Sequence, residues 1–201
     1  MASAAILAGG QARRYAGCDK SALLVGGRSI LDRQLSALAQ LTDDLMIVGG
    51  APAAGAIRAA TRAGVDVRAV PDRVPDSGPL GGLDAALAGA RDEAVVLLAC
   101  DMPFVTAALL AYLVGLAGEA EAVVPRTERG YHPLCAVYTR ACQPAVARCL
   151  AARRLTMVGL LAEVRVRIVT EHELDRLGGH RRLLANVNAP EDHEALRRHE
   201  P

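Results

Sequence analysis

Short apolar runs alternate with stretches of helical spacing along this chain, and that alternation constrains the fold more than any other feature. The runs are nearly continuous in Ala, Val, Leu and Ile, so each predicted strand must be buried on both faces. Strands are predicted at residues 4–8, 45–48, 65–70, 94–99, 121–124 and 164–169. Helices are predicted at residues 30–41, 53–63, 80–90, 107–116, 140–152 and 191–198.

Buried strands separated by helices predict a mostly parallel sheet with helices on both faces, a three-layer α/β/α Rossmann-like sandwich. The chain has 201 residues, of which 52% are hydrophobic, so it can bury a full core in one unit. No linker or shift in composition marks an internal boundary, and we expect a single domain over residues 1–201. Such sheets bind ligands at the carboxyl ends of their strands, which is where functional residues are sought.

The charge balance argues against a nucleic-acid partner. The formal net charge is only +1, whereas a nucleic-acid binder needs a clustered cationic face for phosphate contacts. Any nucleotide that the protein uses is therefore expected to be a small molecule.

The cysteines and the apolar segments predict a cytoplasmic protein. The five cysteines include no Cys-x-x-Cys pair or zinc-like spacing; they are Cys18, Cys100, Cys135, Cys142 and Cys149. Gly9 and Gly10 interrupt the first apolar run, unlike a secretory signal. The apolar segment 102–118 is shorter than the roughly 20 residues that a membrane span needs, so we expect a strand end followed by a buried helix.

The segment after the first strand has the composition of a phosphate-binding loop. Leu7 and Ala8 lead into Gly9 and Gly10, whose backbone N–H groups can approach an anion closely. Arg13, Arg14 and Lys20 follow, and Lys20 is the single lysine in a chain with 22 arginines. An ammonium fits crowded phosphate oxygens where a planar guanidinium does not, although a chance exception to a compositional bias would give the same count. The loop is neither a Walker A motif nor a dinucleotide fingerprint.

Asp101 follows the strand at 94–99, at the sheet edge where ligands are expected. Mg²⁺ usually takes one or two protein carboxylates together with substrate phosphates and waters, so one aspartate is enough to begin a site. The alternative is that Asp101 caps the helix after Pro103, but Thr106 is the better cap.

Two further segments supply candidate ligand contacts. Asp72 follows the third strand and can bond a nucleotide hydroxyl or amine. The segment from Gly78 and Pro79 to Gly82 is predicted to be a loop whose backbone approaches a base or sugar, although glycines are common in any strand-to-helix connection.

The late part of the chain carries an asparagine pair and one irregular stretch. Asn186 and Asn188 lie two residues apart, on the same side of an extended segment, and Asn188 is equally suited to cap the last helix before Pro190. The stretch 126–133 reads as a substrate loop, in which His132 faces either the substrate or solvent.

Taken together, these motifs resemble the molybdenum cofactor guanylyltransferases over nearly the whole chain. The resemblance rests on Leu-Ala-Gly-Gly-x-x-x-Arg with Lys20, Gly-Pro-Leu-Gly-Gly, Cys-Asp-Met-Pro, His-Pro-Leu and Asn-Val-Asn-Ala-Pro-Glu-Asp, in that order. It implies a nucleotidyltransferase fold and transfer of GMP from GTP to the terminal phosphate of molybdopterin that carries molybdenum. Pyrophosphate leaves, and the product is the guanine dinucleotide cofactor.

The resemblance also implies roles for individual residues. The GTP contacts are Leu7, Ala8, Gly9, Gly10 and Lys20, with Gly49 and Asp72 near the base or ribose. Asp101 holds Mg²⁺, Arg14 and Lys20 steady the leaving phosphates, and Asn186 and Asn188 face the pterin. Such an enzyme also makes transient contact with carrier proteins of the cofactor or with the enzymes that accept it.

The chain departs from the family pattern at two places. The usual Arg-x-Gly becomes Arg14-Tyr15-Ala16 with Gly17 one place late, and Gly49 stands where many relatives have asparagine.

A nucleotidyltransferase of the same fold that uses CTP or a sugar phosphate fits the composition equally well. A nucleotide-binding protein without catalysis is a further alternative, which the presence of both Lys20 and Asp101 disfavours.

Overall fold

A computed structural model describes residues 1–8, 23–49 and 66–187 of the chain. Its main sheet has the strand order β10-β7-β9-β6-β1-β4-β5, and β8 pairs with β7. The strands are β1 (Ala2–Leu7), β4 (Leu45–Val48), β5 (Arg68–Val70), β6 (Ala94–Ala99), β7 (Ala122–Thr127), β8 (Gly130–Tyr131), β9 (Cys135–Thr139) and β10 (Val166–Val169). A separate hairpin is formed by β2 (Leu24–Val25) and β3 (Arg28–Ser29).

The sheet is mostly parallel, as the sequence predicts. β1 pairs in parallel with both β4 and β6, β4 with β5, and β10 with β7. Only β9 and β8 run in the opposite direction among the described strands of this sheet. The carboxyl ends of the other strands therefore lie at one edge, which is where the sequence places its candidate ligand residues.

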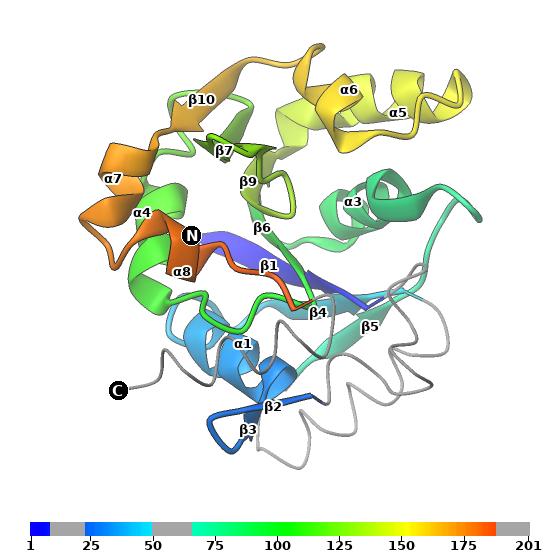
Figure 1. The fold of residues 1–201 in the computed structure, drawn as a ribbon. Coiled ribbons are helices and arrows are strands. Elements are labelled where there is room, and N and C mark those ends of the chain that lie inside the picture. The colour runs from blue at the N-terminus through cyan, green and yellow to red at the C-terminus, as the bar shows by residue number, and fades with distance from the viewer. Residues whose placement is uncertain (9–22, 50–65, 188–201) are drawn as a thin grey trace.

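Helices cover both faces of the sheet (Figure 1). On one face lie α1 (Ile30–Leu38), α4 (Ala107–Gly115), α7 (Glu171–Asp175) and α8 (His180–Leu183). On the other lie α3 (Gly78–Gly89), α5 (Gln143–Ala151) and α6 (Met157–Leu161), with a short 3-10 turn at Arg140–Cys142 before α5. The predicted three-layer architecture is confirmed.

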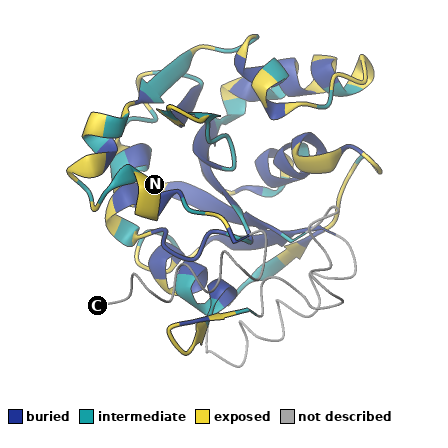
Figure 2. Cartoon of the chain, in the orientation of Figure 1, coloured by how far each residue is buried: buried dark blue, intermediate teal, exposed yellow. Residues whose placement is uncertain are grey.

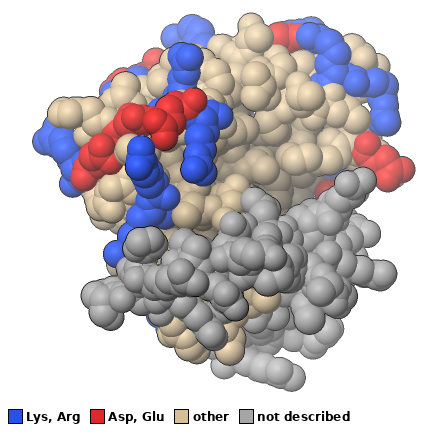
Figure 3. Space-filling model, viewed as in Figure 1, with Lys and Arg blue, Asp and Glu red and all other residues tan. Residues whose placement is uncertain are grey.

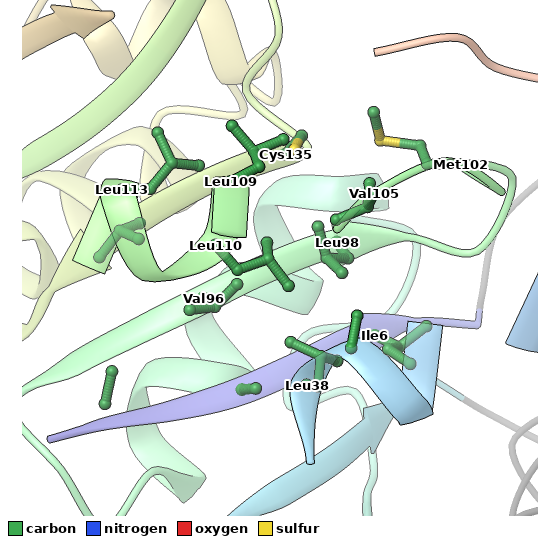
Figure 4. Packing of buried hydrophobic residues seen from close by; sticks show 14 of the residues in the cluster. Ile6, Leu38, Val96, Leu98, Met102, Val105, Leu109, Leu110, Leu113 and Cys135 are labelled. Carbon is green, nitrogen blue, oxygen red and sulfur yellow. The ribbon is translucent and has the colours of Figure 1, made fainter. Parts of the chain in front are cut away.

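The period of two along β1 divides the core between these faces. Ala4 and Ile6 belong to the cluster under α1 and α4, whereas Ala5 and Leu7 belong to the cluster under α3 and α5. All six residues of β1 are buried, because helices cover both of its faces (Figure 2). In the first cluster, leucines of α4 pack over Val96 of β6 (Figure 4).

Several predicted elements differ from those observed. β9, which separates β6 from β7, was not predicted. Residues 126–133 were predicted to be irregular, and this is wrong, because most of them form a hairpin. β7 continues to Thr127 and turns into β8, with Gly130 at a φ of 105° that favours glycine. The helices predicted at 53–63 and 191–198 lie outside the described residues. Within the described part of the chain, no helix has the length and apolar character to cross a membrane.

Candidate functional site

Backbone hydrogen bonds join the ends of three parallel strands at the carboxyl edge. The Ala8 N–H donates to the Val48 carbonyl at 2.8 Å, and the Gly49 N–H donates to the Val70 carbonyl at 3.1 Å. The residues just after β1, β4 and β5 are therefore neighbours in space. This edge brings together Ala8, Gly49 and the segment that leads to Asp72.

Asp101 lies two residues beyond β6 at the same edge and is half-buried. Its carbonyl accepts a hydrogen bond of 2.9 Å from the Val187 N–H, which brings the C-terminal segment to this point. Thr106 caps α4 by accepting from the Leu109 N–H at 3.2 Å. The sequence preference for Thr106 as the cap is confirmed, and Asp101 does not have that role.

Gln34 is a site residue that the sequence analysis missed. It lies on α1 with 1% of its surface exposed, and its Nε2 donates to the Ala99 carbonyl at 2.7 Å and to the Met102 carbonyl at 3.2 Å. These two carbonyls flank Asp101, so Gln34 fixes the backbone on both sides of the carboxylate. The available signal was a lone glutamine between Leu31 and Leu35, on the apolar stripe of a predicted helix.

The segment from Gly78 to Gly82 is not the loop that the sequence predicted. α3 begins at Gly78, with Pro79 in its first turn, where proline is favoured because its missing N–H has no partner in a helix. Gly78 has a φ of 56° and open space around it. A Cβ on Gly82 would lie 2.8 Å from Leu7 Cδ2, so a larger residue there would force the buried Leu7 side chain to shift, and glycine lets α3 pack closely on β1.

The remaining described candidates differ in what they can offer a ligand. The Leu7 side chain is buried in the core, and the amide of Ala8 is used within the sheet. Gly49 has a φ of 138°, which favours glycine, and its amide is also bonded, so its carbonyl is the backbone group left for a ligand. Asp72 and Asn186 are exposed, and Asn186 adjoins the Val187 that bonds to Asp101.

The other candidates of the sequence analysis lie outside the described residues: Gly9, Gly10, Arg14, Lys20 and Asn188. The shifted glycine at position 17 lies there too.

His132 lies at the end of the β7–β8 hairpin and is half-buried. Its Nε2 is 2.9 Å from Thr127 Oγ1, and its N–H donates to the Pro125 carbonyl at 2.8 Å. Burial lowers the pKa of His132, and the nearby Arg129 and His180 lower it further. A neutral imidazole, which can donate one hydrogen bond and accept another, is therefore favoured at this position.

The side chains at the carboxyl edge suit a metal ion that takes most of its ligands from substrate phosphates and water. Among the described residues, no three His, Cys, Asp or Glu side chains converge as a metal-binding group. A zinc site of the closed structural type is not built from them, whereas the single carboxylate of Asp101 matches the sparse protein coordination of Mg²⁺ beside phosphates.

Comparison with known proteins identifies the family. The model of the MobA-like NTP transferase domain matches residues 4–168, which include β1, β6 and Asp101. The chain belongs to this family. It is a nucleotidyltransferase, and the sequence-based recognition of the family is confirmed.

The relatives and the solved structures agree with this assignment. The "Probable molybdenum cofactor guanylyltransferase" of Pelotomaculum thermopropionicum is 35% identical over 191 residues, which cover 95% of this chain and 89% of the relative. The molybdopterin-guanine dinucleotide biosynthesis protein A of Archaeoglobus fulgidus has a TM-score of 0.78 at 22% identity, covering 98% and 97% of the two chains. Rv0371C of Mycobacterium tuberculosis, solved in complex with manganese, has a TM-score of 0.63 at 21% identity and covers 98% of both chains. These two structures share the fold of this MobA-like chain.

Proposed function

We propose that this MobA-like transferase moves GMP from GTP to the terminal phosphate of molybdenum-molybdopterin, releasing pyrophosphate and forming the guanine dinucleotide cofactor. The observation that carries the proposal is the position of Asp101. It lies at the carboxyl edge beside the end of β1. Gln34 bonds the carbonyls of Ala99 and Met102 on either side of it, and the Asp101 carbonyl accepts from the Val187 N–H. The name of the Pelotomaculum thermopropionicum relative supports the choice of substrates.

The nucleotide side of the proposed site is the edge formed by β1, β4 and β5. GTP would lie over Leu7, Ala8, Gly9 and Gly10, with Gly49 and Asp72 near its base or ribose. Gly78 and Pro79 at the start of α3 would border it, while Gly82 would act through the packing of α3 against Leu7. Arg14 and Lys20 would hold the departing pyrophosphate, because displacement at phosphorus needs alignment and neutralisation of charge more than a protein nucleophile.

The acceptor side would be the C-terminal segment. Asn186 and Asn188 would face the pterin, and the bond between Val187 and Asp101 would keep Val187 and its neighbours beside the reacting phosphates. We extend the proposal to transient contact with carrier proteins of the cofactor or with enzymes that accept it.

Asp101 would hold the divalent cation in this scheme. Mg²⁺ bound there would offset the negative charge that grows on the phosphates during transfer. The half-buried position of Asp101 limits the access of water, which strengthens the attraction between its carboxylate and a cation. Gln34 keeps the Asp101 backbone in place without itself being a ligand.

Replacement of Asp101 tests the proposal. We expect Asp101→Ala to lower GTP-dependent pyrophosphate release by at least about 100-fold, the scale of losing one charge-stabilising group in a transition state. The fold should survive, because Asp101 bonds to Val187 through its backbone carbonyl. The measurement is pyrophosphate release in the presence of Mg²⁺ and molybdopterin, with the thermal unfolding midpoint as the check on folding.

A matched control and a second nucleotide complete the experiment. Asp43 is an exposed aspartate just before β4, at the opposite edge of the sheet, so Asp43→Asn should leave the rate unchanged. CTP in place of GTP should give little pyrophosphate. Full activity of Asp101→Ala, or a preference for CTP, would contradict the proposal.

A further inference from the structure

A second concave site lies between α1, the start of α4 and α8, and is here called the arginine pocket. Its volume is about 460 Å³, within the range typical of small-molecule sites. The lining residues come from three parts of the chain: Arg28, Arg33, Ser36, Ala37 and Gln40; Pro103, Phe104, Val105, Thr106 and Ala107; and Leu177, Gly178, Arg182 and Leu183. None of the described residues assigned above to GTP or the pterin lines it.

The charge of the arginine pocket has one sign. Arg28, Arg33 and Arg182 line it, and among the described residues no aspartate or glutamate does. Among the ion pairs of the described residues, neither Arg28 nor Arg182 takes part in any. The positive charges of Arg28 and Arg182, on the walls of one concavity, repel one another, so an anion placed between them would lower the energy of the site.

The arginines are held in place yet keep donors for a ligand. Arg28 Nη2 donates to Ser36 Oγ at 2.7 Å and to the Asp32 carbonyl at 3.3 Å, which uses only part of its fork of five N–H groups. The Arg182 guanidinium lies over the Phe104 ring, 5.3 Å from its centre. Arg33 has a structural role, since its Nε and Nη2 donate to the Val25 carbonyl.

We propose that the arginine pocket binds a small molecule that bears phosphate groups, at a site distinct from the transfer site. Planar guanidinium forks match phosphate oxygens in geometry and charge. The N-terminus of α4 also borders the pocket and adds a partial positive charge. The arginines are confined to one concavity of this size, which suits a compact polyanion better than an acidic peptide, since a peptide would need cations spaced along an extended surface.

The pocket shares a wall with the transfer site. Residues 103–107 line the pocket and directly continue the segment that holds Asp101. Phe104 packs in a small cluster with Val25, Ile30 and Val187, and Val187 is the residue that bonds to the Asp101 carbonyl. A ligand in the pocket would therefore bear on the same segment that positions the proposed metal ligand.

The single phenylalanine of the chain gives a direct probe. Phe104 is the only one, so a fluorine-labelled phenylalanine gives a single signal, from the wall of this pocket. We expect titration with inorganic pyrophosphate, in EDTA, to shift its fluorine NMR signal to saturation. Arg28→Gln, and Arg28→Gln combined with Arg182→Gln, should raise the dissociation constant at least about tenfold, since hydrogen bonds to charged groups rank among the stronger contacts.

A control variant and a peptide separate the alternatives. Arg176→Gln removes an exposed arginine near the pocket that does not line it, and should leave the dissociation constant unchanged. Equal affinity in Arg28→Gln and the wild type would overturn the proposal, since the shift would then come from binding elsewhere. So would the absence of a saturable shift, or tighter binding of a hexaglutamate peptide than of pyrophosphate. Thermal unfolding of each variant checks that it is folded.

Discussion

Gln34 shows how one buried side chain can govern a carboxylate that it does not touch. Gln34→Leu puts an apolar side chain of similar size on α1 and removes both hydrogen bonds to the carbonyls of Ala99 and Met102. We expect the concentration of Mg²⁺ for half-maximal activity to rise and the turnover rate to fall about tenfold, because small displacements of a positioned group are costly in catalysis. The measurement is pyrophosphate release against Mg²⁺ concentration.

If Gln34 served only to stabilise the fold, Gln34→Leu would not change the Mg²⁺ concentration for half-maximal activity. Gln40→Leu is the control. Gln40 is exposed and donates only to the Ser36 carbonyl within its own helix region, so Gln40→Leu should behave as the wild type. An unchanged Mg²⁺ requirement in a folded Gln34→Leu protein would show that Asp101 does not depend on Gln34.

Individual residues could be predicted from the sequence where their position follows from local rules. Asp101 and Thr106 were predictable, because a strand end and a helix cap are both local features. Gln34 was not, since the carbonyls it bonds lie 65 and 68 residues away in the chain. The reason for Gly82 was also hidden, because it depends on the Leu7 side chain of another element.

Among the elements, α7 depends on one carboxylate that joins it to its neighbours. Thr170 and Glu173 form a capping box, and Glu173 Oε1 also accepts from Arg167 Nη2 of β10 at 2.6 Å and from the Tyr112 hydroxyl of α4 at 2.7 Å. The hydrogen bond from Arg167 lowers the pKa of Glu173 and outweighs the effect of burial, so the carboxylate is charged at neutral pH. This network secures the outer end of the sheet.

Loss of that carboxylate should destabilise the protein measurably. We expect Glu173→Ala to lower the free energy of unfolding by about 2 kcal/mol, because it removes a cap and leaves the partly buried Arg167 without the nearer of its two carboxylate partners. Urea unfolding measures this. Glu128→Gln is the control: Glu128 pairs with Arg181 at 3.5 Å between exposed side chains, and should cost less than about 0.5 kcal/mol. Equal effects of the two would contradict the network.

The region around α7 also carries neighbouring surface charges of opposite sign. Opposite charges lie side by side toward the left of the surface in Figure 3, where β10, α7 and α8 are located. Their ion pairs include Arg167 with Glu119 and Glu173, and Arg181 with Glu128. Here cations are matched by carboxylates, which contrasts with the arginine pocket, where no described carboxylate lines the cavity.

Strands were predicted correctly where the sequence pattern that marks them lies within the strand itself. The bounds of β4 and β6 match the prediction, because buried parallel strands are continuous apolar runs. β9 was missed because the short run from Cys135 to Thr139 follows His132-Pro133 closely, and its place between β6 and β7 depends on pairing across the sheet. The direction of a fully buried strand also leaves no trace in its pattern of burial.

For the molecule as a whole, one buried carboxylate joins separate parts of the sheet at the edge opposite the transfer site. Asp44 precedes β4 and is 5% exposed. Its Oδ1 accepts from Arg68 Nε of β5 at 3.1 Å, and its Oδ2 accepts from the Arg91 N–H at 2.9 Å. Ser3 of β1 accepts from the same Arg91 N–H at 3.1 Å. Asp44 therefore connects β4, β5 and the turn before β6.

The stability of the whole fold should depend on pH through this group. Burial alone would raise the pKa of Asp44, but the hydrogen bonds from Ser3, Arg91 and Arg68 outweigh it and hold the pKa below its ordinary value of 3.8. A lowered pKa in the folded state means that the charged carboxylate stabilises the fold fully above pH 3.8. That contribution is lost as the pH falls from there through the folded-state pKa.

Asp44→Asn separates this contribution from other titrating groups. At neutral pH we expect the variant to unfold with a free energy about 2 kcal/mol lower than the wild type, because an amide replaces a charged acceptor of several hydrogen bonds. Below pH 3.8 the difference between the two proteins should shrink, since the wild-type carboxyl becomes neutral as well. Urea unfolding of both proteins across this range measures the difference. A gap that stays constant as the pH falls would mean that the charge of Asp44 does not hold the strands together, and that the packing of its side chain does.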